Sequence, residues 1–130
     1  MTKLVSITED FKSSVSRLEE VLSVEKTDIV RDSAIQRFEI AFEMAWKTVK
    51  AFLEESHNTV CSSPKTCFKD AYRHKLIDYD EFWLKIADLR NETAHTYKEA
   101  VAEKVYAQLP EVLEYLKKLF SKIKEVTSNQ

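Results

Sequence analysis

The sequence contains no glycine among its 130 residues, and its two prolines are Pro64 and Pro110. Sheet proteins need many tight turns, which depend on glycine and proline, so their near-absence disfavours a β-rich fold and favours helices with few connections. A chain of this length forms one domain that buries about two thirds of the surface exposed when unfolded. We therefore expect a single helical domain over residues 1–130.

A strong charge of one sign is also missing. Charged residues make up 32% of the chain, but the formal net charge is only −2. Such a balanced chain does not attract nucleic acid over a distance, so any contact with RNA has to come from a local basic patch. DNA is not an expected partner.

Long apolar runs are absent as well. The uncharged stretches are far shorter than the roughly 18 residues of a membrane span, and the amino-terminal residues lack the apolar core of a secretory signal. We expect no membrane association and a cytoplasmic location. Cysteines stay reduced there, which predicts that Cys61 and Cys67 are free thiols.

Apolar residues repeat at helical spacing in the first half of the chain. A helix is expected from an N-cap at Thr8 to about residue 23, and a longer one over residues 28–55, whose heptad-like stripe suits packing against other long helices. The first stripe comprises Phe11, Val15, Leu18 and Leu22, and the second comprises Ile35, Phe38, Phe42, Ala45, Val49 and Phe52.

Three more helices are expected in the second half. Ser63 as N-cap and Pro64 at the first helical position predict a short helix to about residue 74. Asp78 is the expected cap of the next helix, which should continue through residues 90–97. The last should begin near residue 98 or 99, be kinked or split at Pro110, and fray from about residue 125. The expected fold is all-α, an up-and-down four-helix bundle with one additional short helix.

The most reactive side chains gather in residues 90–97, which read RNETAHTY. Arg90, Asn91, His95 and Tyr97 offer a fixed cation, an amide, a titratable imidazole and a phenol. On a continuous helix Arg90 and Tyr97 share one face, and Asn91 and His95 share a neighbouring face. Arg90 and His95 lie about 140° apart, which a long arginine side chain could bridge. This set of groups suits a phosphate-bearing ligand.

Glu43, Trp46 and Lys47 form a second candidate cluster. Glu43 and Lys47 are four residues apart, a favourable spacing for a helical ion pair. One interpretation is a face that contacts a nucleotide or a partner protein beside residues 90–97. The simpler interpretation is a salt-bridged flank with a tryptophan in the core.

Metal-binding interpretations are weaker. Two Glu-x-x-His pairs, Glu54/His57 and Glu92/His95, match the signature of di-iron carboxylate bundles, but both fall at predicted helix ends. A zinc site could be assembled from a histidine and cysteine set whose spacing fits no standard zinc motif. That set comprises His57, Cys61, Cys67 and His74. We expect no metal and no cofactor.

Two sequence blocks together resemble one family. They are RFEIAFEMAWK at residues 37–47 and RNETAHTY at residues 90–97, with Ser63-Pro64 and Trp83 between them. In this order they resemble the nucleotidyltransferase substrate-binding proteins, the HepT-type members of the HEPN superfamily, over nearly the whole chain. The glycine common in that family between the short helix and the next one is absent, and Lys75 stands near its place.

The resemblance implies a homodimer encoded beside a minimal nucleotidyltransferase, which is its partner. In that family the helical protein is the toxin of a toxin–antitoxin pair and a metal-independent endoribonuclease. The nucleotidyltransferase is the antitoxin, and it attaches AMP to the motif tyrosine. An older view treats the helical protein as a substrate-binding subunit of the transferase.

The resemblance also implies roles for the motif residues. His95 would be the general acid or base in RNA cleavage, Arg90 would stabilise charge on the phosphoryl oxygens, and Asn91 would orient the imidazole or the phosphate. Tyr97 would accept AMP. One chain supplies one such histidine, and a symmetric dimer with two facing motifs would supply a second proton carrier.

Two other interpretations stay open. The protein could be a non-enzymatic adaptor that binds a nucleotide or the transferase. Alternatively, Arg90 and His95 could simply close the end of a helix, where cations are favourable beside the free carbonyl groups.

Overall fold

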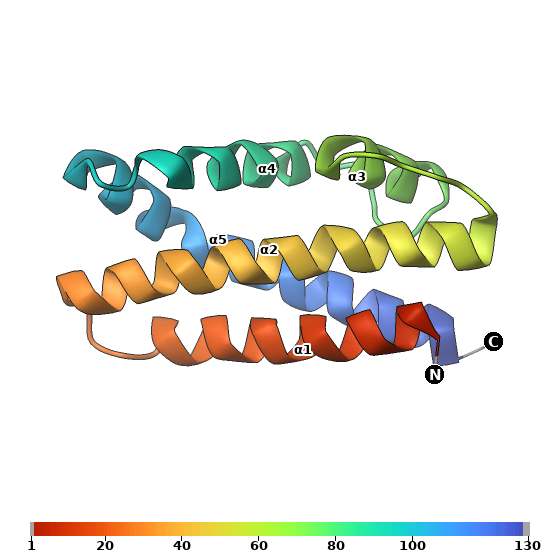
Figure 1. Cartoon of the computed structure of the whole chain (residues 1–130), viewed down its shortest axis with the longest axis horizontal. Helices are drawn as coiled ribbons and strands as arrows, with labels where there is room; N and C mark the ends of the chain where they lie inside the picture. Colours follow the sequence, from red (N-terminus) through yellow and green to blue (C-terminus); the bar gives the residue numbers. More distant parts are fainter. Residues whose placement is uncertain (1, 129–130) are drawn as a thin grey trace.

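The computed structural model describes residues 2–128, which form five α-helices, one short 3₁₀ helix and no β-strand. Helices α1 (Lys3–Leu22) and α2 (Asp28–His57) are antiparallel neighbours. The shorter helices α3 (Pro64–Arg73) and α4 (Phe82–Glu92) follow one another along one side and together take the place of a third long helix (Figure 1). Helix α5 (Glu99–Ser128) returns behind α2. The predicted four-helix bundle with one short helix is confirmed.

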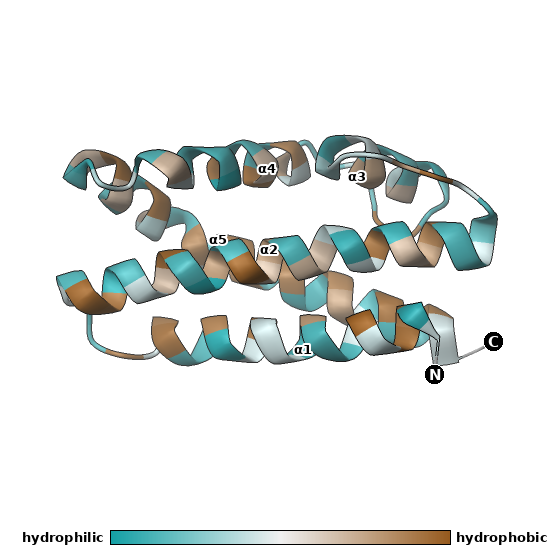
Figure 2. Ribbon diagram, viewed as in Figure 1, coloured by the Kyte–Doolittle hydropathy of each residue, from teal (hydrophilic) through white to brown (hydrophobic). Residues whose placement is uncertain are grey.

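The predicted apolar stripes form the core. In α2 all six stripe residues are buried, and none is more than 4% exposed: Ile35, Phe38, Phe42, Ala45, Val49 and Phe52. In α1, Phe11 and Leu18 are fully buried, while Leu22 is only partly buried. Hydrophobic and hydrophilic residues both occur in every helix (Figure 2), as expected for amphipathic helices that bury one face. Each large side chain buried in this way stabilises the fold by about 1.5–3 kcal/mol.

Helix α1 begins earlier than predicted. Thr2 is its N-cap, and its side chain accepts a hydrogen bond from the backbone N–H of Val5 at 3.1 Å. Thr8, the expected cap, is buried within the helix, where its hydroxyl donates to the Leu4 carbonyl at 2.6 Å. Burial of Leu4 draws this extra first turn into the bundle, and its N–H donates to Glu55 of α2 at 2.9 Å.

Asp78 does not cap α4, so that prediction is wrong. The carboxylate of Asp80 instead accepts a hydrogen bond from the backbone N–H of Phe82 at 2.9 Å, and α4 starts at Phe82. Asp78 lies in the preceding connection, where it lines a pocket. Both aspartates precede the apolar stripe, and only the path of the connection decides which of them reaches the free N–H.

Helix α5 continues through Pro110 without being split and extends to Ser128, beyond the predicted end of order near residue 125. Pro110 is exposed, while Leu109 and Leu113 beside it are buried. Packing of this face holds the helix together across the hydrogen bond that proline cannot donate.

Cys61 and Cys67 form a disulfide with 5.2 Å between their Cα atoms, so the prediction of free thiols is wrong. An expected compartment does not determine whether two thiols meet, whereas the path of the chain does. The connection after α2 returns to the start of α3 and brings Cys61 against Cys67, and both residues are buried. The segment enclosed by the bridge contains Ser63, which caps α3 with its side chain on the N–H of Thr66.

Lys75 has a positive φ of 63° in the turn after α3. This left-handed conformation costs a residue with a Cβ about 1–2 kcal/mol and is where glycine is favoured. Two backbone hydrogen bonds hold the turn, from Lys75 to Tyr72 at 3.0 Å and from Leu76 to Ala71 at 2.9 Å. The turn therefore keeps a glycine-like geometry although lysine occupies it.

Within residues 2–128, none of the helices is both long enough and apolar enough to span a membrane.

Candidate functional site

The segment of residues 90–97 is not one continuous helix. Helix α4 ends at Glu92, the 3₁₀ helix η1 (Thr93–His95) follows, and Tyr97 lies in the connection to α5. The predicted shared face of Arg90 and Tyr97 is therefore wrong, because it assumed 3.6 residues per turn throughout. The α-helix gives way to the 3₁₀ helix where the Thr93 hydroxyl donates to the Arg90 carbonyl at 2.6 Å.

Arg90 is held in place from two sides. Its Nη1 donates to Thr93 Oγ1 at 3.0 Å and lies 3.4 Å from Glu39 Oε2 on α2. The Arg90 side chain is 36% exposed and that of Glu39 is 34% exposed, so the pair sits at the surface with one side open to water. The cation therefore has a fixed position and can still reach a ligand.

His95 and Tyr97 are both exposed beyond the end of α4. Their ring centroids are 6.2 Å apart, and Tyr97 is 78% exposed. The ammonium group of Lys98 lies 5.9 Å from the centroid of the Tyr97 ring. The imidazole and the phenol are thus neighbours that face solvent and not the apolar interior.

Arg90 and Asn91 line a groove of about 450 Å³ between α2 and α4. Glu43 and Trp46 line it from α2, and Ser63, Pro64 and Lys65 form another wall at the start of α3. We name it the motif groove, and its remaining lining residues are Phe42 and Ala87. The structure thus brings part of each predicted cluster to one groove. His95 and Tyr97 of the first cluster and Lys47 of the second do not line it.

The carboxylate of Glu43 organises the α2 side of the motif groove. Trp46 Nε1 donates to Glu43 Oε2 at 3.0 Å, and Lys47 Nζ lies 3.0 Å from Glu43 Oε1. Partial burial tends to raise the pKa of Glu43, but these hydrogen bonds and the nearby charge of Arg90 lower it overall. Glu43 therefore stays ionised and fixes the indole.

Both earlier interpretations of this cluster are partly satisfied. The predicted ion pair on the flank of α2 is present. Trp46, however, is only partly buried and borders a groove, whereas a core tryptophan would be enclosed.

Sequence reasoning missed several residues of the site. Thr93 lies inside the motif and Glu39 inside the 37–47 block, but neither side chain has the reactive chemistry or charge pattern by which the candidate residues were recognised. The signal available for Glu39 was its place at i−4 from Glu43, which puts it on the same face of α2. The wall formed by residues 63–65 was predicted only as a helix start.

The di-iron interpretation finds no support in residues 2–128. Within them, one group of three carboxylates brings its ligand atoms within 4.8 Å of one another, and it contains neither Glu-x-x-His pair. Its members are Asp28, Glu99 and Glu103. The buried Arg31 already pairs with all three, so a protein cation occupies this place.

The zinc interpretation is wrong, because both thiols are used in the disulfide. The two histidines of the proposed set stack on each other instead, with 4.3 Å between the ring centroids of His57 and His74. His74 Nε2 also lies within hydrogen-bonding distance of the Thr59 hydroxyl, at 3.2 Å.

Similar proteins are known. Residues 7–125 match the family described as nucleotidyltransferase substrate binding protein like. A curated relative, the probable ribonuclease HepT of Haemophilus influenzae, is 36% identical over 93 residues, which are 65% of this chain. The match spans 64% of the length of that relative.

Two solved structures share the fold. A protein from Thermus thermophilus is 30% identical with a TM-score of 0.83, covering 88% of this chain and 98% of its own. A Haemophilus influenzae protein, described as the substrate-binding domain of a nucleotidyltransferase, is 25% identical with a TM-score of 0.68, covering 93% and 96%. Since the family match covers most of its length, the chain belongs to the nucleotidyltransferase substrate-binding protein family.

Proposed function

We propose that this protein is a HepT-type toxin, a metal-independent endoribonuclease whose antitoxin is a minimal nucleotidyltransferase. The observation that carries the proposal is the arrangement at the end of α4. An anchored arginine cation is followed, within one connection, by a solvent-facing imidazole and a solvent-facing phenol. The likeness to a probable ribonuclease HepT supports the same function.

The chemistry follows from the groups present. The imidazole of His95 takes the proton from a ribose 2′-hydroxyl, and the 2′-oxygen forms a bond to the adjacent phosphorus. The bond from phosphorus to the 5′-oxygen breaks, and an imidazolium protonates the leaving oxygen. Arg90 stabilises the negative charge that develops on the phosphoryl oxygens, and Asn91 positions the phosphate or the imidazole.

A homodimer is part of the proposal, because each chain contributes one motif histidine. Cleavage is most efficient when one imidazole accepts a proton while another donates one. Two copies related by a twofold axis would place a second His95 opposite the first. The exposure of His95 and Tyr97 at the end of α4 leaves room for such an arrangement.

Tyr97 is the proposed acceptor of AMP. Its exposed phenol oxygen attacks the α-phosphorus of ATP, the phosphorus–oxygen bond to pyrophosphate breaks, and the phenolic proton passes to solvent or base. The product carries a negative phosphodiester close to His95, whose ring centroid is 6.2 Å from that of Tyr97. Electrostatic repulsion and bulk would then keep an RNA phosphate away from the imidazole.

The test is cleavage of total bacterial RNA by the wild-type protein, by His95→Ala and by Tyr97→Phe. We expect His95→Ala to lose cleavage, whereas Tyr97→Phe should still cleave and should no longer be labelled with AMP by the transferase. Equal cleavage by wild type and His95→Ala would reject catalysis.

A second candidate function is a non-enzymatic adaptor that presents a nucleotide to the transferase. The observation that favours it is the motif groove, which combines Trp46, Arg90 and Asn91 without including His95. The adaptor predicts that Arg90→Ala weakens nucleotide binding, whereas His95→Ala does not and no RNA is cleaved. Equilibrium dialysis with ATP distinguishes it from the ribonuclease.

A further inference from the structure

We propose that Trp46 is a stacking platform for a single-stranded RNA, and that a basic groove between α1 and α2 carries the strand away from the motif. The proposal depends on the proposed ribonuclease activity in one respect, which is that the bound RNA strand is the substrate. The binding site itself is argued from the grooves, charges and ring contacts around Trp46.

Trp46 borders two grooves. One is the motif groove, which contains Arg90 and Asn91. The other, of about 390 Å³, lies where α1 and α2 meet, and we name it the α1–α2 groove. It is lined by Lys3, Ser6, Ile7, Asp10, Trp46, Lys47 and Lys50. Because Trp46 lines both, the two grooves adjoin at its side chain and offer a path from α4 to the start of α1.

Positive charge is concentrated along this path. Five cationic side chains line the two grooves, against the carboxylates of Asp10 and Glu43: Lys3, Lys47, Lys50, Lys65 and Arg90. The chain as a whole has a formal net charge of −2, so this local excess is the kind of basic patch that RNA contact requires.

Some of these cations already have acidic partners. Lys47 pairs with Glu43 at 3.0 Å, Lys65 pairs with Asp88 at 2.6 Å, and Arg90 pairs with Glu39 at 3.4 Å. In the described part of the chain, Lys3 and Lys50 have no carboxylate within ion-pair distance. Both lie in the α1–α2 groove, so this end of the path is best suited to neutralise phosphates.

The indole of Trp46 is fixed but not stacked. Its hydrogen bond to Glu43 sets the orientation of the ring, and among residues 2–128 no aromatic ring stacks on it. Trp83 differs, because it is 4% exposed and already stacks on Phe68 with 4.5 Å between ring centroids. A fixed, partly exposed indole between lysines suits stacking with a base of any sequence.

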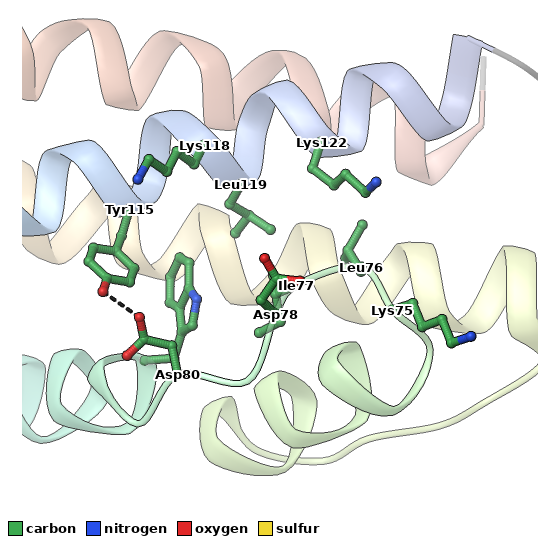
Figure 3. A pocket seen from close by; sticks show the side chains of 10 residues that line it. Lys75, Leu76, Ile77, Asp78, Asp80, Tyr115, Lys118, Leu119 and Lys122 are labelled. Carbon is green, nitrogen blue, oxygen red and sulfur yellow. Dashed lines mark hydrogen bonds between the residues drawn. The ribbon is translucent and has the colours of Figure 1, made fainter.

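Another pocket contains lysines but lacks these properties. It has a volume of about 310 Å³ and lies between α5 and the connection before α4 (Figure 3). Its tryptophan is the buried Trp83, and the ammonium groups of Lys118 and Lys122 point in opposite directions. These two lysines therefore provide a matched control for non-specific attraction of RNA.

The experiment uses the full chain carrying His95→Ala, which prevents cleavage, and Trp83→Phe, which leaves Trp46 as the sole tryptophan of the two in the sequence. A mixed-sequence single-stranded RNA oligonucleotide is titrated while tryptophan fluorescence and the anisotropy of labelled RNA are followed. We expect RNA to quench Trp46. In the His95→Ala chain with Trp83 retained, Trp46→Ala should weaken binding roughly tenfold and Trp46→Phe less, because a smaller ring still stacks.

The lysine variants test the direction of the path. Lys3→Ala with Lys50→Ala should weaken binding and reduce its salt dependence, because two phosphate contacts are lost. Lys118→Ala with Lys122→Ala should bind as the parent does. Circular dichroism and thermal unfolding confirm that each variant is folded.

Three results would overturn the proposal: unchanged RNA affinity in folded Trp46→Ala, an equal loss in the Lys118/Lys122 variant, or quenching by ATP alone with no preference for RNA. Failure of the ribonuclease is a separate outcome. If the wild type cleaves no RNA but quenching of Trp46 persists, the binding site stands without catalysis. If cleavage depends on His95 but RNA affinity does not depend on Trp46, the binding site fails and the ribonuclease stands.

Discussion

The guanidinium of Arg90 donates to the hydroxyl of Thr93 at 3.0 Å, and that hydroxyl donates back to the Arg90 carbonyl at 2.6 Å. This reciprocal pair joins the last turn of α4 to the 3₁₀ helix that carries His95. Thr93 is only 7% exposed, so water has little access to replace these bonds. The position of the motif cation therefore depends on a threonine with no reactive role of its own.

Thr93→Val removes both hydrogen bonds while keeping the shape of the side chain. We expect the free energy of unfolding to fall by about 1 kcal/mol, because the lost bonds are only partly replaced by water. We also expect RNA cleavage to fall about tenfold, because Arg90 would be less well placed. That decrease corresponds to a loss of about 1.4 kcal/mol of transition-state stabilisation. Urea unfolding and cleavage rates measure the two effects.

Thr93→Ser is the matched control, because it keeps the hydroxyl. It should cleave RNA nearly as the wild type does. If the serine and valine variants cleave equally well, the hydrogen bond to Arg90 has no role in the reaction.

A second pair predicts how stability depends on pH. The Tyr115 hydroxyl donates to the carboxylate of Asp80, which links α5 to the start of α4. This bond, together with that from the Phe82 N–H, lowers the pKa of Asp80, and it raises the pKa of Tyr115 from its ordinary 10.0 to about 12. The Asp80 contribution is present above its ordinary pKa of 3.8 and is lost as the pH falls through the lowered value. The Tyr115 contribution is present below pH 10.0 and is lost as the pH rises through about 12.

Tyr115→Phe should therefore lower the melting temperature near neutral pH and flatten its pH dependence at both ends. Thermal unfolding over the acid and alkaline ranges measures this. The difference between ultraviolet titrations of the wild type and of Tyr115→Phe isolates the Tyr115 phenol from the other tyrosines. Tyr106→Phe is a suitable control, because Tyr106 also lies on α5 without that carboxylate partner. If the melting temperatures of the wild type and Tyr115→Phe differ by the same amount at every pH, the prediction is contradicted.

The third prediction concerns the core beneath the motif groove. Phe68 is 2% exposed, stacks on Trp83 and lies 5.9 Å from Phe42, measured between ring centroids. Phe68→Ala should lower the free energy of unfolding by about 3–5 kcal/mol, because a cavity replaces the ring. Phe68→Leu should cost less, about 1 kcal/mol. Chemical denaturation measures both, and similar values for the two variants would mean that the core collapses around the site.

The fourth prediction concerns the disulfide. Replacing Cys61 and Cys67 together by serine should lower the free energy of unfolding by about 2 kcal/mol, the value expected for so short a closed segment. A reducing agent should destabilise the wild type by a similar amount and leave the double variant unchanged. Thermal unfolding with and without reductant provides the comparison, and a wild type insensitive to reductant would contradict the prediction.

The fold was predictable because burial determines it. Stripes such as that from Ile35 to Phe52 tolerate no other helical register, since a rotation would expose several large side chains at once. Helix ends were harder to predict. The caps expected at Thr8 and Asp78 were wrong, because Thr2 caps α1, and α4 has Glu81 at its N-cap position with the Asp80 carboxylate accepting from the Phe82 N–H.

The site was predictable in its composition and not in its geometry. The motif and the 37–47 block identified the family, and Glu43, Trp46, Arg90 and Asn91 line one groove. The end of α4 at Glu92 separates His95 from that groove, and no helical periodicity anticipates it. The disulfide was not predicted for a related reason. Contact between the two cysteines depends on the path of the connection between α2 and α3.

That disulfide has a consequence for the motif groove. Ser63, Pro64 and Lys65 form one wall of the groove, and all three lie between the bridged cysteines. Reduction of the disulfide to two thiols would remove this covalent restraint from the wall, while Arg90 and Asn91 would remain on α4. The bridge therefore limits the positions that this wall can take, and so limits the widths that the groove can adopt.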